Sequence, residues 1–204
     1  MLSSQNTRRR LLALFAATPL CAALAACGKE AVQFKGSNIS GTKLGEEGVA
    51  LTDQDGQPRT LADYAGKVVV VFFGFTQCPD VCPTALAELS QVMGELGPDA
   101  KRVQVVLITV DPERDTPEIL KQYVQAFNPS FAGLTGTPEQ IKAAANSFKA
   151  YYAKSPSPDG STYTMDHTGA FYLLDTKGKA RVLVPNGSGV QAMTHDIKLL
   201  LDEG

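Results

Sequence analysis

The chain has 204 residues and lacks the features on which several broad functions depend. Its 19 Lys and Arg residues do not exceed its 21 Asp and Glu residues, so there is no sign of nucleic-acid binding, which needs an excess of positive charge. The sequence has no internal repeat, no phosphate-binding glycine loop, no Ser/His/Asp arrangement for nucleophilic catalysis and no methionine-rich metal-binding cluster. With only 2 His and 4 Cys residues, the choice of side chains for a metal or redox site is small.

One apolar stretch marks the N-terminal region. It covers residues 11–26, LLALFAATPLCAALAA, is broken by Pro19 and follows three arginines at positions 8–10. A helix needs about 20 apolar residues to span a membrane, whereas the apolar region of a signal peptide needs about 7–15. The length of the stretch and the positive charge before it therefore favour a signal peptide over the alternative, an uncleaved membrane anchor.

The end of this stretch predicts lipidation. Leu24-Ala25-Ala26-Cys27 resembles the lipobox of bacterial lipoproteins, in which the cysteine is acylated. We expect residues 1–26 to be a lipoprotein signal peptide, Cys27 to carry the lipid, residues 27–44 to be a tether, and residues 45–204 to form the folded domain. This domain is expected at the bacterial cell envelope, anchored to a membrane by the lipid and facing the periplasm or another extracytoplasmic side.

Export limits what the four cysteines can do. Cys21 leaves with the signal peptide and Cys27 is lipidated, so only Cys78 and Cys82 remain, in a compartment where disulfides persist. A disulfide between residues so close in the chain closes a very small loop and adds less stability than one that closes a long loop. Reactivity or metal binding therefore explains this pair better than structural cross-linking does.

The residues around the cysteine pair predict a strand, a short loop and a helix. Residues 68–73 are apolar and bounded by Gly66 and Gly74, which indicates a buried strand. Pro83 is favoured at the first position of a helix, which we expect to continue to residue 96. Both sulfurs would then lie near the positive end of the helix, where the thiolate form is favoured.

The rest of the chain predicts alternating strands and helices. Strands are expected at residues 103–110, 170–174 and 180–184, helices at 116–127, 137–148 and 190–201, and a hairpin or mobile loop at 155–164. This order favours a single α/β domain with a mixed central sheet and helices on both faces. The carboxylates of the loop at 111–115 have a spacing that suits helix capping and turns better than acid–base catalysis.

The order of these elements resembles the thioredoxin fold, and four motifs resemble one family within it. The motifs are FFGFTQCPDVCPTAL, VDPERDTPE, LTGTPEQI and DHTGAFYLLD, and together with the residues between them they cover roughly residues 34–200. They resemble the Sco/SenC family of copper proteins, which help to assemble cytochrome c oxidase. One departure is Gln77, where some members have His, but this position is not one of the family's ligands.

The resemblance implies that Cys78, Cys82 and His167 bind copper, as Cu(I), Cu(II) or both. The chemistry agrees, because two soft thiolates suit Cu(I) and an added imidazole makes the site acceptable to both oxidation states. In thioredoxin-like oxidoreductases the place of His167 usually holds a cis-proline beside the cysteines. Asp166 is a candidate for orienting the His167 imidazole or balancing its charge, and a turn aspartate is the alternative. His195 falls off the apolar face of the last helix and is expected to be solvated.

Two functions remain open. The first is a metallochaperone that receives copper from an upstream donor and delivers it to the copper-site subunit of cytochrome c oxidase. The second is a thiol–disulfide oxidoreductase that uses Cys78 and Cys82 as a redox pair, is recharged by a thiol reductant and reduces the cysteines of that subunit. The sequence therefore leaves open whether the protein is an enzyme. A peroxiredoxin-like peroxidase fits the cysteine spacing less well, and structural zinc normally requires four ligands where the chain offers three.

Overall fold

The computed structural model describes residues 33–157 and 160–204. The predicted signal peptide and the predicted lipidation site, Cys27, lie outside the described residues. Residues 34–204 form one compact unit. None of the helices in the two described ranges combines the length and the apolar character that a membrane span requires.

A mixed sheet of eight strands forms the centre of the unit, in the order β1-β10-β9-β4-β5-β6-β2-β3. The strands β4, β5 and β6 run parallel to one another, while β9 pairs antiparallel with β4 and β2 pairs antiparallel with β6. The bounds are β1 Ser37–Asn38, β2 Leu51–Asp53, β3 Pro58–Arg59, β4 Val68–Gly74, β5 Val103–Thr109, β6 Ala132–Thr135, β9 Ala170–Leu174 and β10 Ala180–Pro185. The predicted mixed sheet is confirmed.

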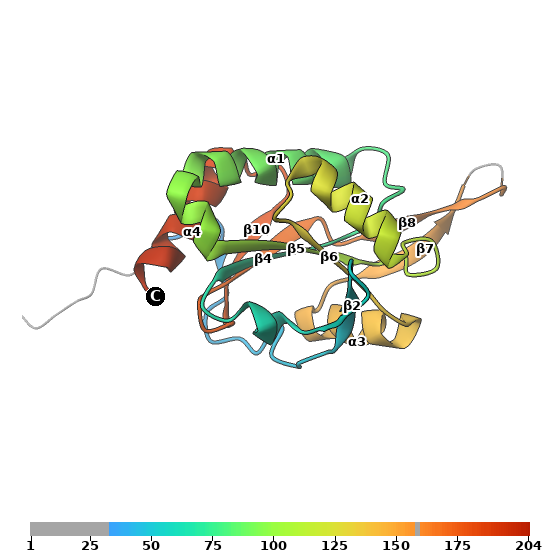
Figure 1. The fold of residues 1–204 in the computed structure, drawn as a ribbon, viewed down its shortest axis with the longest axis horizontal. Helices are drawn as coiled ribbons and strands as arrows, with labels where there is room; N and C mark the ends of the chain where they lie inside the picture. The colour runs from blue at the N-terminus through green and yellow to red at the C-terminus, as the bar shows by residue number, and fades with distance from the viewer. Residues whose placement is uncertain (1–32, 158–159) are drawn as a thin grey trace, which may run out of the picture. The chain divides into compact units, whose positions relative to one another are not determined.

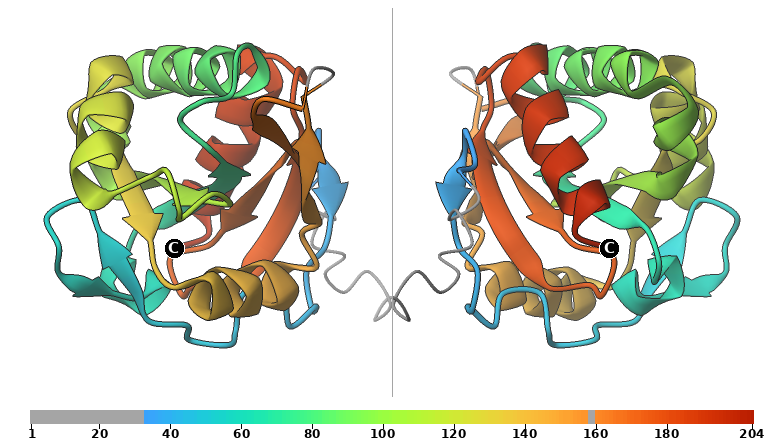
Figure 2. Two further views of the ribbon diagram at one scale, coloured as in Figure 1. Left: turned by 90° about the vertical axis from the view of Figure 1, so that its right-hand side faces the viewer. Right: turned by 90° about the vertical axis from the view of Figure 1, so that its left-hand side faces the viewer.

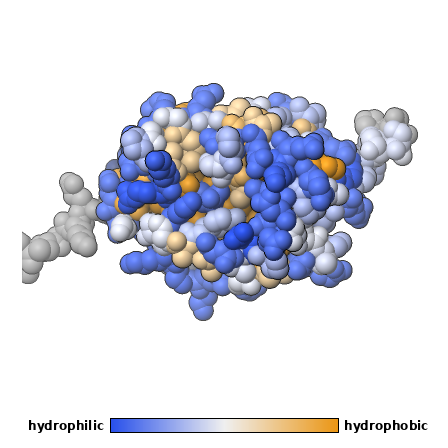
Figure 3. Space-filling view, in the orientation of Figure 1, coloured by the Kyte–Doolittle hydropathy of each residue, from blue (hydrophilic) through white to orange (hydrophobic). Residues whose placement is uncertain are grey.

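Four α-helices cover the two faces of this sheet (Figure 1, Figure 2). They are α1 Val81–Leu96, α2 Pro117–Phe127, α3 Pro138–Phe148 and α4 Val190–Asp202, and short 3₁₀ helices span Leu61–Tyr64 and Gly97–Arg102. The views show α1, α2 and α4 on one face and α3 on the other, which confirms the predicted cover on both faces. The face seen in Figure 3 is covered mainly by hydrophilic side chains, because the apolar ones are used in the core between the sheet and these helices.

The two central strands explain why the sheet needs cover on both faces. All seven residues of β4 and all seven of β5 are buried, which is typical of parallel strands between two layers of helices. Successive side chains point to opposite faces. Phe73 therefore packs on the Phe148 ring of α3, at 5.6 Å between centroids, while Phe72 packs on the other face against Phe171, at 5.2 Å.

Local capping signals fix the starts of α2 and α3. Thr116 and Thr137 each cap a helix whose first residue is proline, and each side chain accepts a hydrogen bond from a backbone N–H of the first turn. The helix after the cysteine pair begins earlier than Pro83, at Val81, so that Cys82 belongs to its first turn.

The segment predicted as a hairpin or mobile loop is a hairpin, with strands β7 Tyr152–Pro156 and β8 Tyr163–His167 paired outside the main sheet.

The packed unit begins before the predicted domain boundary at residue 45. Phe34 packs against the core, and β1 pairs with β10. The buried carboxylate of Asp196 on α4 accepts hydrogen bonds from the backbone N–H groups of Lys35, at 2.7 Å, and Gly36, at 2.8 Å. A Cβ at Gly36 would lie 2.7 Å from a methyl of Val182, so this approach requires glycine. Residues 34–44 are thus part of the fold, and the polar composition that predicted a tether is outweighed by these contacts.

Asp196 should be the anchor of this N-terminal strap. Asp196→Ala removes a buried carboxylate that accepts two hydrogen bonds from partly buried backbone donors, and a hydrogen bond to a charged group contributes about 1.5–3 kcal/mol. We expect the free energy of unfolding, measured by urea denaturation, to fall by about 2 kcal/mol or more. Asp202→Ala, at an exposed position on the same helix, serves as the control and should change it by less than about 0.5 kcal/mol. Equal stability of the two variants would contradict the anchoring role.

Candidate metal centre

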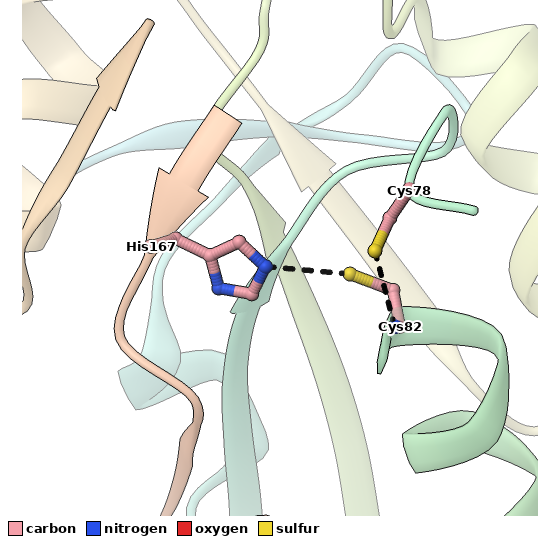
Figure 4. A group of neighbouring side chains, drawn as sticks. All are labelled: Cys78, Cys82 and His167. Atoms are coloured by element: carbon pink, nitrogen blue, oxygen red, sulfur yellow. Dashed lines mark hydrogen bonds between the residues drawn. The ribbon is translucent and has the colours of Figure 1, made fainter. Parts of the chain in front are cut away.

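The fold brings together three side chains that lie far apart in the sequence. The two sulfurs of Cys78 and Cys82 and a ring nitrogen of His167 all lie within 4.8 Å of one another. Both cysteines are free thiols, and the Cys82 sulfur lies 3.5 Å from Nε2 of His167. Figure 4 shows the imidazole pointing from β8 toward the thiols of the loop and of α1. In the described part of the chain, this is the group of His, Cys, Asp or Glu side chains with a geometry suited to a metal ion.

The cysteines are positioned by the turn from β4 into α1. Cys82 sits in the first turn of the helix and is fully buried, while Cys78 lies in the preceding loop and is half-buried. The backbone N–H of Cys82 donates to the sulfur of Cys78 at 3.3 Å, which holds the two residues together. A Cβ at Gly74 would lie 2.9 Å from the Phe72 ring and 3.0 Å from the Cys82 sulfur, so glycine at the end of β4 leaves room for both side chains.

The imidazole of His167 is held by aromatic rings and by one backbone carbonyl. The rings of Phe72 and Phe75 meet it edge-on, at centroid distances of 6.0 and 5.9 Å. Its Nδ1 lies 3.2 Å from the carbonyl oxygen of Thr168. Because a carbonyl only accepts hydrogen bonds, Nδ1 carries the proton and the lone pair of Nε2 faces the thiols. Burial lowers the pKa of His167 below the usual value for histidine, which favours the neutral ring that binds metals.

Asp166 acts on His167 through charge. Its side chain is exposed, and the orienting hydrogen bond at Nδ1 goes to Thr168 instead. The negative charge of Asp166 raises the pKa of His167 and so opposes the effect of burial. The hydrogen bond at Nδ1 goes to the Thr168 carbonyl and not to Asp166, so a role of Asp166 in balancing the charge of His167 stays a prediction.

The expectation that both sulfurs favour the thiolate form is wrong for Cys82. Burial raises the pKa of this thiol well above its usual range, and the nearby negative charge of Asp115 acts in the same direction. Desolvation is the largest cause of this rise, because burial disfavours the charged thiolate. A bound metal ion would favour the thiolate of Cys82, because its positive charge replaces the thiol proton.

Asp115 supports the residues before the cysteine loop, whereas its spacing in the sequence had suggested capping and turns. Its fully buried carboxylate accepts hydrogen bonds from the backbone N–H of Thr76, at 3.0 Å, and from the hydroxyls of Thr76 and Thr109, both at 2.6 Å. Thr76 stands just before the cysteine loop. Burial raises the pKa of Asp115, although these hydrogen bonds act against the rise. The sequence could have indicated this contact. Thr76 follows β4 and Thr109 is the last residue of β5, and the ends of neighbouring parallel strands meet at one edge of the sheet.

His195 lies away from the three converging side chains. It sits on α4, its side chain is 40% exposed, and its Nδ1 lies 2.9 Å from the carboxylate of Asp196. This agrees with the expectation of a solvated residue outside the metal site.

Comparison with known proteins assigns the family. A family model described as SCO1/SenC matches residues 40–202, which is most of the chain. The chain belongs to the SCO1/SenC family. The mitochondrial SCO2 homologue of Mus musculus is 44% identical over 137 residues, covering 66% of this chain and 54% of that protein. The chain thus spans about half the length of the mammalian SCO2 relatives that it matches.

Solved structures of the SCO1/SenC family share the fold. Bradyrhizobium japonicum ScoI with copper bound is 38% identical, with a TM-score of 0.69 over 81% of this chain and 98% of that one. A SCO1/SenC family lipoprotein from Bacillus anthracis is 28% identical, with a TM-score of 0.68 over 83% of this chain and 99% of that one. These matches confirm the predicted thioredoxin-like α/β class.

The difference in burial between the two thiols leads to a prediction about reactivity. In the reduced, metal-free protein at neutral pH, Cys78 should react with iodoacetamide at least about tenfold faster than Cys82. The reason is that burial raises the pKa of Cys82, and each unit of increase lowers the fraction of thiolate about tenfold. Mass spectrometry after a short exposure measures the two rates. In urea the rates should become similar, and comparable rates in the folded protein would show that Cys82 is not protected.

Proposed function

We propose that this protein is a copper metallochaperone that binds copper through Cys78, Cys82 and His167 and delivers it to the copper-site subunit of cytochrome c oxidase. The observation that carries the proposal is the convergence of two free thiols and a neutral imidazole within 4.8 Å. The copper-bound ScoI structure supports the choice of metal. The delivery target follows from the family resemblance of the sequence.

The donor set fits copper better than zinc. Two thiolate sulfurs are soft ligands that suit Cu(I), and one imidazole makes the set acceptable to Cu(II). A structural zinc site usually takes four ligands, and this group offers three. A set of three ligands, one of them half-buried, also suits a cargo metal, because an acceptor's ligands can approach before the donor's ligands have left.

Delivery would proceed by exchange of ligands with no change in the oxidation state of copper. Cys78 is the more accessible sulfur and would be replaced first by a thiolate of the acceptor, while Cys82 and His167 still hold the metal. As each sulfur of this protein is released it takes up a proton, and each acceptor thiol loses one. The high pKa of the buried Cys82 thiol favours this uptake and so favours release.

The location of the protein is part of the proposal. The lipobox-like ending of the apolar stretch supports lipidation at Cys27, as does the Bacillus anthracis relative described as a lipoprotein. A lipid anchor would hold the domain at the membrane that contains the oxidase. Cys27→Ser should move the protein from the membrane fraction to the soluble fraction of a bacterial host, as measured by immunoblotting. Cys21→Ser is the control and should remain in the membrane fraction.

A copper titration of the reduced domain, residues 34–204, tests the metal site. We expect one Cu(I) per protein, and Cu(II) should give an absorption from sulfur-to-copper charge transfer. Loss of a group that only orients a ligand typically costs about 10–100-fold in affinity, so His167→Ala, which removes a ligand, should cost at least that much. His195→Ala is the matched control and should bind like the wild type. Unchanged affinity in His167→Ala would exclude the site as drawn.

Thiol–disulfide exchange is the second candidate, and the asymmetry of the two thiols favours it. An accessible Cys78 could attack a disulfide while the buried Cys82 resolves the mixed disulfide, so that the substrate is reduced and the Cys78–Cys82 pair is oxidised. His167→Ala should largely spare this exchange, measured with an oxidised peptide and a thiol reductant. A wild-type protein that exchanges disulfides and binds no copper would establish the oxidoreductase as the function.

A further inference from the structure

The hairpin that carries His167 is not hydrogen-bonded to the main sheet. β7 and β8 pair only with each other, and His167 is the last residue of β8. At its base, next to α3, the hairpin is closed by hydrogen bonds. The backbone N–H of Thr168 donates to the carbonyl of Tyr151, and the backbone N–H of Tyr151 donates to the Thr168 hydroxyl. A two-stranded hairpin alone is only marginally stable. His167 lies beside this base, and the strands beyond it are held by the buried Met165 side chain and by the contacts around Tyr163.

Arg114, in the loop after β5, is the residue that connects the hairpin to the cysteine loop. One guanidinium nitrogen, Nη1, donates to the backbone carbonyl of Tyr163 on β8 and to the side-chain oxygen of Gln77, both at 3.0 Å. Gln77 immediately precedes Cys78. The guanidinium also lies 3.8 Å from the centre of the Tyr163 ring, and its Nε donates to the carboxylate of Asp111.

The partners of Arg114 are themselves fixed. Asp111 is almost fully buried, and its other oxygen accepts a hydrogen bond from the Tyr163 hydroxyl at 2.9 Å. On β7, Lys154 lies 4.6 Å from the centre of the same ring and pairs with Glu113 at 2.6 Å. The planar fork of arginine suits this combination of stacking and several hydrogen bonds. We call Arg114, Asp111, Tyr163 and Gln77 the arginine clasp.

We propose that Arg114 is a positioning residue for the metal site, which holds the hairpin against the cysteine loop and thereby keeps His167 within reach of the two thiols. This inference rests on the proposed copper binding. It adds that Arg114, which is not itself a ligand, raises the affinity for copper. With the clasp broken, β8 loses the contacts that hold it toward the cysteine loop at Tyr163, four residues before His167, and only the base and the packed rings still position the imidazole. His167 then spends less time facing Cys82, and the dithiol binds copper without its third ligand.

The alternative is that Arg114 only stabilises the fold. Its side chain is 18% exposed and ion-paired with a buried carboxylate, so its loss could weaken the whole domain. The two roles differ in one respect. A positioning residue acts on copper through His167, so its loss has no further effect where His167 is already absent, whereas general destabilisation lowers affinity in both cases.

A double-mutant cycle on the reduced domain, residues 34–204, separates the two roles. Cu(I) affinity is measured by competition with a chromophoric chelator for the wild type, Arg114→Met, His167→Ala and the double variant. We expect Arg114→Met to lower the affinity about 10–100-fold in the wild-type background. In the His167→Ala background it should change the affinity by less than about twofold, within the error of additivity. Equal losses in both backgrounds, or no loss in the wild type, would overturn the proposal.

Arg181→Met is the matched control. Arg181 is 21% exposed and pairs with two carboxylates, those of Asp175 and Glu203, but lies on β10, close to the end of β9 that is remote from His167. Its loss should leave copper affinity within about twofold of the wild type. Should Arg114→Met not fold, Tyr163→Leu removes the stacked ring and the hydroxyl from the other side of the clasp. The same cycle with Tyr163→Leu must then give the same pattern.

A measurement without metal keeps this inference distinct from the proposed function. Hydrogen exchange of the amides in residues 163–167 of the metal-free protein should become faster in Arg114→Met, while exchange in β4 and β5 should stay unchanged. Unchanged exchange in the hairpin would overturn the clasp even if copper binds as proposed. Faster exchange confined to the hairpin would support the clasp even if the wild-type protein failed to bind copper.

Discussion

Burial of one sulfur at the end of a strand governs the rest of this structure. The Cys82 thiol packs against Gly74, which has no side chain. Because Cys82 belongs to the first turn of α1, this contact packs the start of the helix against the sheet. The same burial keeps the thiol protonated, since the charged form would lose its solvation. A site of this kind is poised for a ligand that brings positive charge of its own, and a soft metal ion does so.

The support for the site comes from the edge of the sheet where β4 and β5 end. Asp115 lies under the cysteine loop as a buried carboxylate with three hydrogen bonds, and Arg114, next to it in the chain, faces the hairpin. One short loop thus serves both halves of the site. The cysteines depend on it through Thr76, and the histidine depends on it through Tyr163.

The two halves differ in rigidity. The cysteines belong to a strand and a helix that pack into the main core, whereas His167 belongs to a hairpin outside the main sheet. In the proposed carrier Cys78 leaves first, so the metal is then held between the rigid sulfur of Cys82 and an imidazole on a separate element that has more freedom to move. The aromatic rings of Phe72 and Phe75 limit that freedom by packing on the imidazole.

The sequence by itself determined what depends on neighbours in the chain. The helices capped by Thr116 and Thr137, the buried strand before Cys78 and the cysteine spacing were all readable, since capping, periodicity and turn chemistry are local. His167 was identified through resemblance, because no local signal ties it to cysteines that lie 85 or more positions away. The resemblance already extended to about residue 34, ahead of the expected boundary at residue 45. The tertiary structure alone decided the protonation of Cys82 and the roles of Asp115 and Arg114. Each of these is set by desolvation or by contacts between elements distant in sequence, and burial is a property of the assembled fold rather than of any segment.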